Sequence, residues 1–426
     1  MIKIYGKNSI KSGEVFERSV PTNDVSGAVS EIIADVIKNG DGALYRLTKK
    51  FDGASLSSLS VSEEEINEAY ESIEPEFERI LERAAENIRE FHKKQVRDGY
   101  MINREDGVVM GQRVIPVDKA GIYVPGGTAA YPSTVLMDAI PAKLAGVPMI
   151  IMVTPPGKDG KIPCAILAAA KVAGVDKIFK IGGAQAIAAL AYGTESVPKV
   201  DKIVGPGNAY VAEAKRQVFG RVSIDMIAGP SEILIISDGN SDARVLAADM
   251  LSQAEHDKSA SAVLITTSET LAKKISEQLE IQIPKLSRAE IARASIDKNG
   301  KIIIADSIED AADISNEIAP EHLELCVDDP FAILPRIRHA GSVFMGRYCP
   351  EPLGDYMAGP NHTLPTSGTA KFSSSLSVSD FVKTMQFSYF TKQALSRYKD
   401  DVAYFAEKEG LTAHAKSAVI RDEVNE

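Results

Sequence analysis

Four of the six histidines in this chain lie in strongly polar settings that suggest chemistry. Gln253 and His256 stand three residues apart at the end of a helical pattern, so both side chains would project from one face of a helix. Such a pair can bind a metal ion or clamp a substrate. Histidine with aspartate and amide oxygens suits Zn²⁺ or a similar ion, although Gln is an infrequent ligand and Glu255 is an alternative to it.

A second polar cluster, Pro320-Glu321-His322, comes just before a predicted strand and places a carboxylate beside an imidazole. An imidazole changes its charge near neutral pH, so this pair could move protons in a reaction. The other two polar settings run from Asp355 to His362 and from Glu409 to His414. One such cluster alone is more often a helix cap or a solvated pair, and it is their recurrence that favours a catalytic site.

Three glycine-rich segments could hold the phosphates of a nucleotide. Each follows a predicted strand and precedes a predicted helix, where free N–H groups and the helix dipole attract anions: 124–128, 181–185 and 204–208. None matches the G-x-G-x-x-G pattern, because Tyr210 stands where the last of them would need its third glycine, and none has the lysine of a P-loop. A dinucleotide site and ordinary tight turns therefore both remain open.

The scaffold around these clusters is predicted to be α/β. Between about residues 121 and 345, short β-branched runs alternate with Ala-rich helical segments, which implies parallel strands joined by right-handed crossovers. The rhythm before and after about Ser231 suggests two sheet units of related design. The predicted strands are 122–124, 149–153, 178–181, 203–204, 232–236, 262–266, 302–305, 323–327 and 342–345.

Both ends of the chain are predicted to be helical. A capping box at Ser62–Glu65 starts one amphipathic helix, and Pro75 starts or kinks a second that continues to Phe91. After about Thr366 the pattern returns to helices. This tail is unusually aromatic, and an arm with so many rings usually covers its own core or a partner subunit; the apolar residues are Phe381, Met385, Phe387, Tyr389, Phe390 and Tyr398.

Composition excludes several classes of protein. The 48 Lys and Arg against 59 Asp and Glu give a net charge of -11 with no basic stripe, which argues against nucleic acid as a partner. The N-terminus has no apolar signal-like region, and the apolar run 149–153 is too short to span a membrane, so we expect a cytoplasmic protein. The three widely spaced cysteines form neither a disulfide framework nor a metal knuckle, and each is expected to be a small buried hydrophobe: Cys164, Cys326 and Cys349.

The residue types alone thus favour a metal-assisted enzyme with a nucleotide cofactor as an open possibility. One rival is a zinc hydrolase in which the glycine-rich loops are only turns. Another is a non-catalytic metal- or nucleotide-binding module. That module would not need Glu321 and His322 beside the metal-binding set.

Over essentially its whole length the chain resembles the histidinol dehydrogenase family. The resemblance is carried by seven motifs in family order, none of which departs from the family pattern: 120–127 (AGIYVPGG), 205–208 (GPGN), 228–232 (AGPSE), 252–256 (SQAEH), 319–323 (APEHL), 354–362 and 409–414. The fold implied is α/β, with two Rossmann-like parallel-sheet domains, helical N- and C-terminal extensions, and a C-terminal arm exchanged in a homodimer. We expect an N-terminal extension at 1–20, a first domain of 21–120 with 232–370, a second domain of 121–231 on the NAD side, and a helical arm at 371–426.

The resemblance also implies the reaction and the site. Family members oxidise L-histidinol to L-histidine through an aldehyde, with two NAD⁺ per product and one Zn²⁺ per site. The zinc ligands carry over to Gln253, His256, Asp355 and His414, and Glu321 and His322 take the acid–base roles. Ser231 and Glu409 are expected to contact the substrate together with the zinc ligands and His322, while Tyr123, Gln185 and Asn208 line the NAD site. In the implied dimer, Glu409 and His414 complete the neighbour's site.

Overall fold

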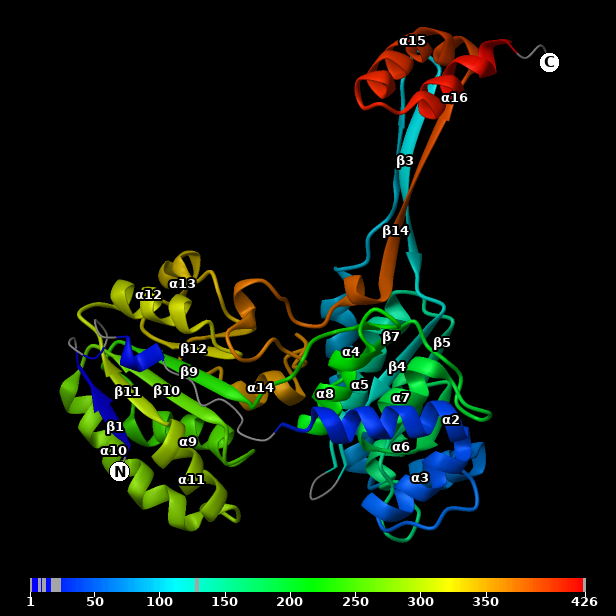
Figure 1. The fold of residues 1–426 in the computed structure, drawn as a ribbon. Helices are drawn as coiled ribbons and strands as arrows, with labels where there is room; N and C mark the ends of the chain where they lie inside the picture. Colours follow the sequence, from blue (N-terminus) through cyan, green and yellow to red (C-terminus); the bar gives the residue numbers. More distant parts are fainter. Residues whose placement is uncertain (1, 7–8, 10–12, 17–23, 127–129, 424–426) are drawn as a thin grey trace. The chain divides into compact units, whose positions relative to one another are not determined.

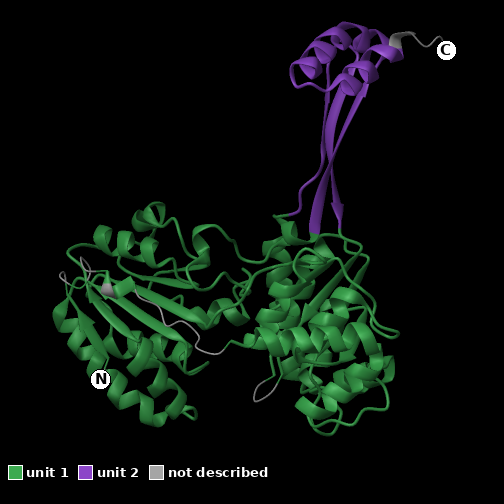
Figure 2. Ribbon diagram, viewed as in Figure 1, with its two compact units in different colours: residues 1–95, 117–381 green, residues 96–116, 382–426 purple. Residues whose placement is uncertain are grey.

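The computed structural model describes residues 2–6, 9, 13–16, 24–126 and 130–423 (Figure 1). The chain divides into two compact units, which Figure 2 colours separately. Unit 1 comprises residues 1–95 and 117–381, and unit 2 comprises residues 96–116 and 382–426. Unit 1 contains two parallel sheets, so the predicted α/β class with two sheet units is confirmed.

The first sheet of unit 1 has five parallel strands in the order β6-β5-β4-β7-β8. In chain order this is 3-2-1-4-5, the order of the first five strands of a Rossmann fold. The residues of its central strands are mostly apolar because helices cover both faces. The strands are β4 (Lys119–Tyr123), β5 (Met149–Thr154), β6 (Lys177–Lys180), β7 (Lys202–Val204) and β8 (Ser223–Ile224).

Among the described residues, seven helices cover the five-stranded sheet. One face contacts α5 (Pro132–Leu144) and α6 (Cys164–Ala173), and the other contacts α7 (Gly183–Tyr192) and α8 (Ala209–Val218). The three N-terminal helices add to the same layers, since α2 contacts α7 and α8, α3 contacts α6, and α4 contacts α5 and α6. They are α2 (Ser26–Phe51), α3 (Glu63–Ser72), which begins with the predicted capping box, and α4 (Pro75–Lys93).

This packing differs from our expectation that residues 21–120 belong with 232–370. An amphipathic helix shows that it has an apolar face but not which sheet that face will cover, and here it covers the five-stranded sheet. The domain boundaries at residues 20, 120, 231 and 370 stay predictions.

The second sheet of unit 1 has six parallel strands in the order β1-β11-β10-β9-β12-β13. Without the edge strand β1, this is again 3-2-1-4-5 in chain order, so the two sheets share a topology. The strands are β1 (Lys3–Tyr5), β9 (Glu232–Ser237), β10 (Ser261–Thr266), β11 (Lys301–Ile304), β12 (His322–Cys326) and β13 (Ser342–Met345).

Helices also cover both faces of the six-stranded sheet. One face packs on α9 (Ala243–Ala254), α10 (Glu269–Gln282) and α11 (Ala289–Asn299), and the other packs on α12 (Ile308–Ile318) and α13 (Pro330–Ile333). The short helix α14 (Glu351–Tyr356) follows β13. The described 3-10 turns are Glu14–Phe16, Ile283–Lys285, Leu334–Arg336, Thr369–Lys371 and Val378–Phe381.

Unit 2 is a three-stranded antiparallel sheet followed by a pair of helices. The sheet has the order β14-β3-β2, and its elements are β2 (Tyr100–Asn103), β3 (Val108–Pro116) and β14 (Val382–Phe390). The helices α15 (Lys392–Lys408) and α16 (Thr412–Glu423) contact each other. Among the described residues, no helix is long and apolar enough to cross a membrane.

Our expectation of helix from Phe381 to Phe390 is wrong. Residues 382–390 form β14, which pairs with β3 along its whole length. Met385, Phe387 and Tyr389 alternate with other residues, which is the period of a strand, but the partner strand lies more than 260 residues earlier in the sequence. The predicted helical tail is therefore correct only from Lys392 onward.

Candidate active site

The predicted acid–base pair lies at the amino end of β12. His322 is the first residue of this strand and pairs with Ile233 near the start of β9, while Glu321 immediately precedes it. Both side chains are buried, Glu321 with 7% and His322 with 5% of its surface exposed. The pair is therefore held by the central strands of the six-stranded sheet and kept largely away from solvent.

The hydrogen bond of His322 fixes which ring nitrogen can act as a base. Its Nδ1 lies 3.0 Å from the carbonyl oxygen of Glu232. A carbonyl oxygen only accepts, so Nδ1 carries the hydrogen and Nε2 keeps its lone pair. Burial lowers the pKa of His322 to about 4, against the opposing charge of Asp355. At neutral pH the imidazole is uncharged and can take up a proton at Nε2.

Glu321 is held by the same part of the backbone. Its Oε2 accepts a hydrogen bond of 2.9 Å from the backbone N–H of Glu232 and lies 3.5 Å from Nδ1 of His322. Burial raises the pKa of Glu321 well above its usual value, although the hydrogen bond from Glu232 opposes that shift. A carboxyl with a raised pKa can exchange a proton near neutral pH, which is the property expected of an acid–base residue.

The short helix α14 brings two carboxylates to the same place. Glu351 and Asp355 are four residues apart and therefore share one face of the helix. Together with His322 they offer one ligand atom each within 4.8 Å of one another. Glu351 is a site residue that the sequence analysis missed. A signal was present in its spacing from Asp355 and in the Pro350-Glu351-Pro352 start of the helix.

The two carboxylates of α14 have opposite pKa shifts. Burial and the charge of Asp355 raise the pKa of Glu351 to about 8. Burial acts to raise the pKa of Asp355, but its hydrogen bond to His362 and the nearby imidazoles together outweigh this and hold that pKa below its usual value. Asp355 is therefore the ionised member of the pair at neutral pH, and Glu351 can hold a proton.

The structure separates the two residues of the predicted helix-end pair. Gln253 lies inside α9 and is buried, with a hydrogen bond between its side chain and Glu351. The helix ends at Ala254, so His256 follows the helix and is exposed. Gln253 therefore lies with the site residues of β12 and α14. His256 lies beyond the end of the helix, so the predicted helical spacing does not apply to it.

Three buried atoms at this cluster fit a divalent cation. Oε1 of Gln253, Nε2 of His322 and Oε1 of Glu351 have no hydrogen-bond partner among the described residues. An unpartnered buried acceptor is costly, and a bound cation removes that cost. Amide oxygen, imidazole nitrogen and carboxylate are also the donor types that zinc accepts. The chemistry of the donors thus fits the predicted metal.

A cavity of about 110 Å³ adjoins these groups and is lined by His322, Asp355, His362, Phe344 and Gly354 among others. His362 lies 3.5 Å from Asp355 through Nδ1 and 3.3 Å from Oγ1 of Thr134 through Nε2. Burial opposes protonation of His362, but Asp355 outweighs that effect and raises its pKa. The cavity is therefore lined by two imidazoles of different charge preference.

Helix α5 of the five-stranded sheet holds the segment that carries His362. Asn361 donates to the backbone oxygen of Met137 at 2.6 Å, and the hydroxyl of Thr363 donates to Asp138 at 2.8 Å. Asp138 is fully buried, and this burial raises its pKa to about 7. The two sheets of unit 1 are thus joined next to the cavity.

The predicted NAD residues all lie at the carboxyl edge of the five-stranded sheet. Tyr123 ends β4, and its hydroxyl oxygen accepts from the N–H of Gly183 at 3.1 Å. Gln185 is buried in the first turn of α7. Asn208 caps α8 by accepting from two backbone N–H groups. The loop predicted at 124–128 lies partly outside the described residues.

A buried ion pair braces the glycine-rich loop after β7. Lys215 pairs with Asp225, and both side chains are almost completely buried. Lys215 also donates to the backbone oxygen of Gly205 at 2.9 Å, while Asp225 accepts from the N–H of the same residue at 2.8 Å. Gly205 has φ +110, and a side chain there would collide with the backbone oxygen of Tyr123. These contacts hold the loop in one conformation. The loop lies between β4 and β7, where the strand order reverses and where α/β sheets bind ligands.

The remaining predicted site residues are placed but not joined to the cluster. Ser231 precedes β9, and its carbonyl oxygen accepts from the N–H of Ser261. Glu409 directly follows α15 and His414 lies in α16, and both are exposed residues of unit 2. Their contacts with substrate and metal stay predictions. Cys326 is buried as expected, while Cys164 is exposed and Cys349 only partly buried, contrary to expectation.

Comparison with known proteins gives a consistent result. The family model described as histidinol dehydrogenase matches residues 17–422. A histidinol dehydrogenase of Clostridium acetobutylicum is 56% identical over 398 residues, covering 93% of this chain and 92% of that protein. One from Bacillus cereus is 54% identical over 416 residues, covering 98% and 96%. The crystal structure of histidinol dehydrogenase from Elizabethkingia anophelis superimposes with a TM-score of 0.93 at 39% identity, covering 99% and 98%.

Proposed function

The chain belongs to the histidinol dehydrogenase family and oxidises histidinol in histidine biosynthesis, and from that premise we propose that it is a zinc- and NAD-dependent enzyme. It carries L-histidinol through the aldehyde to L-histidine in two successive oxidations. The observation that supports this most directly is the buried acid–base pair Glu321 and His322 beside the unpartnered oxygens of Gln253 and Glu351.

Gln253, His256, Asp355 and His414 are the proposed zinc ligands, and Glu351 is added as a neighbour that contacts Gln253. Zinc held by these residues would help to orient the substrate, with some Lewis-acid assistance. Ser231 and Glu409 are proposed to contact the substrate. The hydrogen bonds between Asp355 and His362 and between Gln253 and Glu351 orient the ligand side chains from outside, as such partners do at metal sites.

His322 is the proposed base of the first oxidation. Its Nε2 takes the hydroxyl proton of histidinol while hydride leaves the adjacent carbon. Nδ1 stays bound to the carbonyl oxygen of Glu232, which keeps the ring in one orientation and one tautomer. The lowered pKa of about 4 ensures that Nε2 is free to accept at neutral pH, since burial disfavours the charged ring.

Glu321 is the proposed base of the second oxidation. The aldehyde must be hydrated before a second hydride can leave, and this step needs an activated water. Glu321 can take a proton from that water because burial raises the pKa of its carboxyl. The backbone N–H of Glu232 holds the carboxyl oxygen in place at 2.9 Å.

The carboxyl edge of the five-stranded sheet is the proposed NAD site, lined by Tyr123, Gln185 and Asn208. Two NAD⁺ molecules bound there in turn would each accept one of the two hydrides. The braced loop at Gly205 and the capped start of α8 give this edge a fixed backbone at the place where an α/β sheet binds a dinucleotide.

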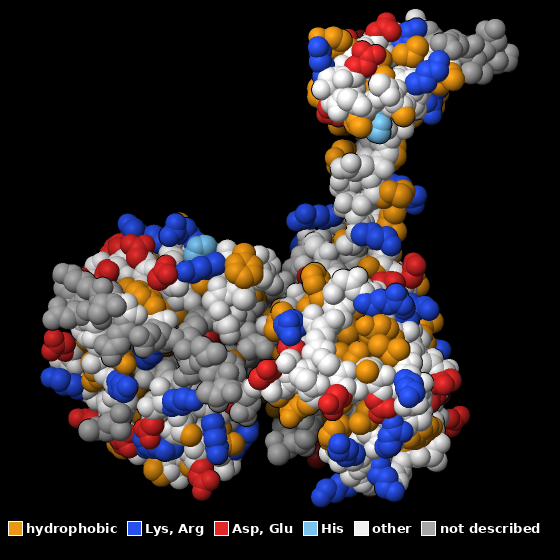
Figure 3. Space-filling view, viewed as in Figure 1, with side chains coloured by type: hydrophobic (Ala, Val, Ile, Leu, Met, Phe, Trp, Pro, Cys, Tyr) orange, Lys and Arg blue, Asp and Glu red, His pale blue; other side chains and the backbone are white. Residues whose placement is uncertain are grey.

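Unit 2 is the proposed arm of a homodimer. Its strands and helices expose large apolar side chains, which a second subunit would cover: Tyr100, Met101, Ile102, Tyr389, Phe390, Tyr404 and Phe405. Figure 3 shows apolar atoms along the surface of this unit. In such a dimer Glu409 and His414 of one chain would act in the partner's site.

The direct test of this function measures metal content and histidinol-dependent NADH formation in the same preparation. We expect chelation to abolish turnover and added Zn²⁺ to restore it. Glu321→Gln should slow oxidation of the aldehyde more than that of the alcohol, whereas His322→Ala should slow both. Full activity in a metal-free preparation contradicts the zinc proposal, and equal losses in both steps for Glu321→Gln contradict the division of roles.

The arm is tested by mixing inactive chains. His414→Ala and His322→Ala chains, denatured and refolded together, should regain activity because one site of the mixed dimer receives both intact histidines. Mixed dimers that form but stay as inactive as the parents would show that the two residues act within one chain.

A further inference from the structure

The imidazole of His322 is fixed at one edge by a hydrogen bond. Its Nδ1 lies 3.0 Å from the backbone oxygen of Glu232. The last torsion of a histidine side chain is broad, so this one bond leaves the plane of the ring free to tilt. The ring of Phe344 lies beside the imidazole, with 6.0 Å between the two ring centroids and 32° between the two planes. This distance is in the range at which aromatic rings attract each other, so Phe344 restrains the tilt.

Phe344 belongs to the strand next to His322. On β13 it pairs with Glu324 of β12, and it therefore shares a face of the sheet with His322, two residues before Glu324. Only 6% of the surface of Phe344 is exposed, so its ring is held inside the protein. Phenylalanine has no group that donates or accepts a proton. Any influence of this ring on proton transfer must therefore pass through His322.

The ring of Phe344 also meets the backbone of α14. A methyl group added at Gly354 would lie 2.4 Å from Cε1 and 2.8 Å from Cζ of Phe344, distances that real Cβ atoms do not show. Gly354 is buried, and its φ is outside the left-handed region, so its backbone conformation does not require glycine. Glycine is also a poor helix former. The space that the ring of Phe344 occupies is therefore the reason for a glycine at this position.

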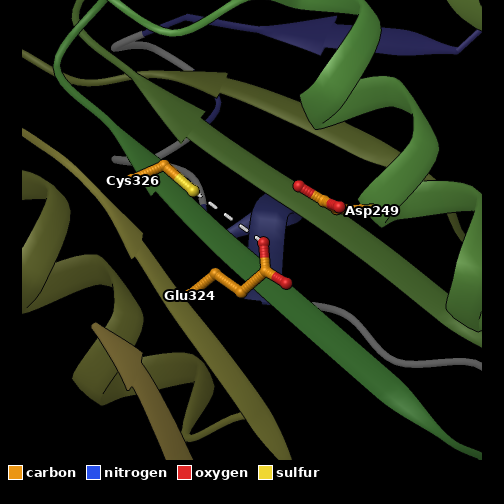
Figure 4. A group of neighbouring side chains, drawn as sticks. All are labelled: Asp249, Glu324 and Cys326. Atoms are coloured by element: carbon orange, nitrogen blue, oxygen red, sulfur yellow. Dashed lines mark hydrogen bonds between the residues drawn. The ribbon is translucent and has the colours of Figure 1, made fainter. Parts of the chain in front are cut away.

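The start of α14 is anchored to β12 next to this ring. Oε1 of the buried Glu324 accepts a hydrogen bond of 2.8 Å from the backbone N–H of Glu351, the first residue of α14. The thiol of Cys326 donates to the other oxygen of Glu324 at 3.9 Å (Figure 4). Because the helix is tied to the strand at its first residue, its next turn, with Gly354, stays in contact with Phe344.

We propose that Phe344 is a positioning residue for His322, in contact with both the imidazole and the backbone of α14, and that Gly354 is needed to leave room for its ring. The ring limits the tilt of the imidazole, and so it keeps Nε2 in the orientation that the bond at Nδ1 allows. This inference rests on the role of His322 as the base of the first oxidation, proposed above.

Gly354→Ala and Phe344→Leu disturb this contact in different ways. The added methyl group displaces the ring, whereas leucine removes it. A misplacement of about 1 Å can cost about 100-fold in rate, so we expect kcat for histidinol to fall by up to about 100-fold in Gly354→Ala. Phe344→Leu should lose less, about tenfold, because the hydrogen bond to Glu232 remains. KM should stay within about threefold of wild type in both, since the proposed substrate contacts lie elsewhere.

The double variant separates positioning from a general loss of packing. With leucine at position 344, the two ring atoms that the new methyl group would meet are absent. Adding Gly354→Ala to Phe344→Leu should therefore cost nothing more, and kcat of the double variant should equal that of Phe344→Leu within about twofold. If Gly354→Ala alone does not fold, Phe344→Leu and the double variant carry the test, because the collision is relieved in both.

Two substitutions elsewhere in unit 1 are matched controls. Phe179→Leu removes a buried ring from β6 of the five-stranded sheet, and Gly42→Ala adds a methyl group in α2 at a place where nothing lies within 4 Å. Both should leave kcat unchanged. Phe179→Leu should nevertheless lower the melting temperature, as Phe344→Leu does, because each leaves a cavity in a core.

The orientation of the imidazole is measured separately, by NMR of protein with labelled histidine. The resonances of His322 are identified among those of the six histidines by their absence in His322→Ala. They should shift in Gly354→Ala, where the neighbouring ring is displaced, and stay in place in Gly42→Ala and Phe179→Leu. A loss of stability alone would not move them.

Three results would overturn the inference and leave the proposed function standing. Wild-type kcat and unshifted His322 resonances in a folded Gly354→Ala variant would show that the ring does not position the base. A raised KM with unchanged kcat in Phe344→Leu would show that the ring contacts the substrate instead. Losses that multiply in the double variant would show that the two residues act independently. Wild-type turnover in His322→Ala, by contrast, would overturn the proposed base and with it this inference.

Discussion

The two parallel sheets of unit 1 share the strand order 3-2-1-4-5, yet their functional residues gather at opposite edges. The five-stranded sheet presents the predicted NAD residues at its carboxyl edge, after β4 and β7. The six-stranded sheet presents Glu321 and His322 at its amino edge, at the start of β12.

The carboxyl edge of the six-stranded sheet is occupied by a salt bridge instead of a glycine-rich loop. Arg347 reaches Asp238 at 2.6 Å and Asp328 at 2.7 Å, beside the ends of β9 and β12, and also donates to Ser241. These strands are the counterparts of β4 and β7 in the other sheet. A shared topology therefore does not carry a shared chemistry, and function must be read from the residues at each edge.

The largest expected effect of a single substitution is at the amino edge. His322→Ala removes the proposed base, and losses of about 10²–10⁴-fold in turnover are typical for such a residue. Steady-state oxidation of histidinol measures the loss. His339→Ala is the control. His339 lies in the segment after α13, and its hydrogen bond to Asn316 is made by the backbone N–H, which the substitution keeps. Similar turnover in both variants would place the chemistry elsewhere.

The second prediction concerns the braced loop of the five-stranded sheet. Lys215→Met leaves Asp225 buried without its partner, which should cost about 3–5 kcal/mol of unfolding free energy. We also expect weaker NAD binding, measured by titration, because Gly205 loses a donor at its carbonyl. Lys202→Met provides the comparison, since its partner Asp380 is more exposed. Equal stability losses in the two variants would remove the special role of Lys215.

A smaller effect is expected at the salt-bridged edge. Arg347→Gln breaks ion pairs to two aspartates, for which about 1.5–3 kcal/mol is a reasonable loss of unfolding free energy. Turnover of the folded variant should stay within about twofold of wild type. The two ion pairs that the substitution removes are expected to contribute to stability and not to the reaction. Denaturant unfolding and turnover are measured on the same sample. A tenfold loss of turnover without a loss of stability would show that this edge takes part in the reaction.

An effect that is small within one pH unit, at most about 1.4 kcal/mol, should appear where the two sheets meet. Burial raises the pKa of Asp138 to about 7 from 3.8, so the folded chain binds a proton that the unfolded chain releases. Stability from this group is present below about pH 4 and is lost as the pH rises toward 7. Asp138→Asn keeps an acceptor for Thr363 but removes the titration. Its unfolding free energy relative to wild type should increase with pH by at most about 1.4 kcal/mol per unit in this window, and a pH-independent difference would contradict the assignment.

The sequence predicted nine strands of the parallel sheets because each of them is a short apolar run next to a helical segment, but it missed the short edge strands β1 and β8. It failed for β2, β3 and β14 because their pairing joins segments that are far apart in the chain. Their exposed rings resemble the apolar face of an amphipathic helix when the partner strand is unknown. Non-local antiparallel pairing leaves little signal in either segment alone.

The site shows the same division. Polar residues in short clusters, such as Glu321 with His322, could be found because neighbours in sequence are neighbours in space. Glu351 and Glu324 were missed, since each acts through a residue that lies far away in the sequence or on another element. The contact of Asp138 with Thr363 spans 225 positions, and no pattern in the sequence announces it.

Along β12, His322, Glu324 and Cys326 share one face and the two leucines share the other. This alternation determines what an error in strand pairing would do to activity. If the strand paired one residue out of register, His322 and Glu324 would enter the apolar layer beneath α12, and two leucines would fill the place of the site. Such a chain would lose its core and its chemistry at once. A molecule with β12 in the wrong register would therefore be inactive, not partly active. The measured activity of a sample then reports the fraction of molecules in which β12 is paired in the correct register.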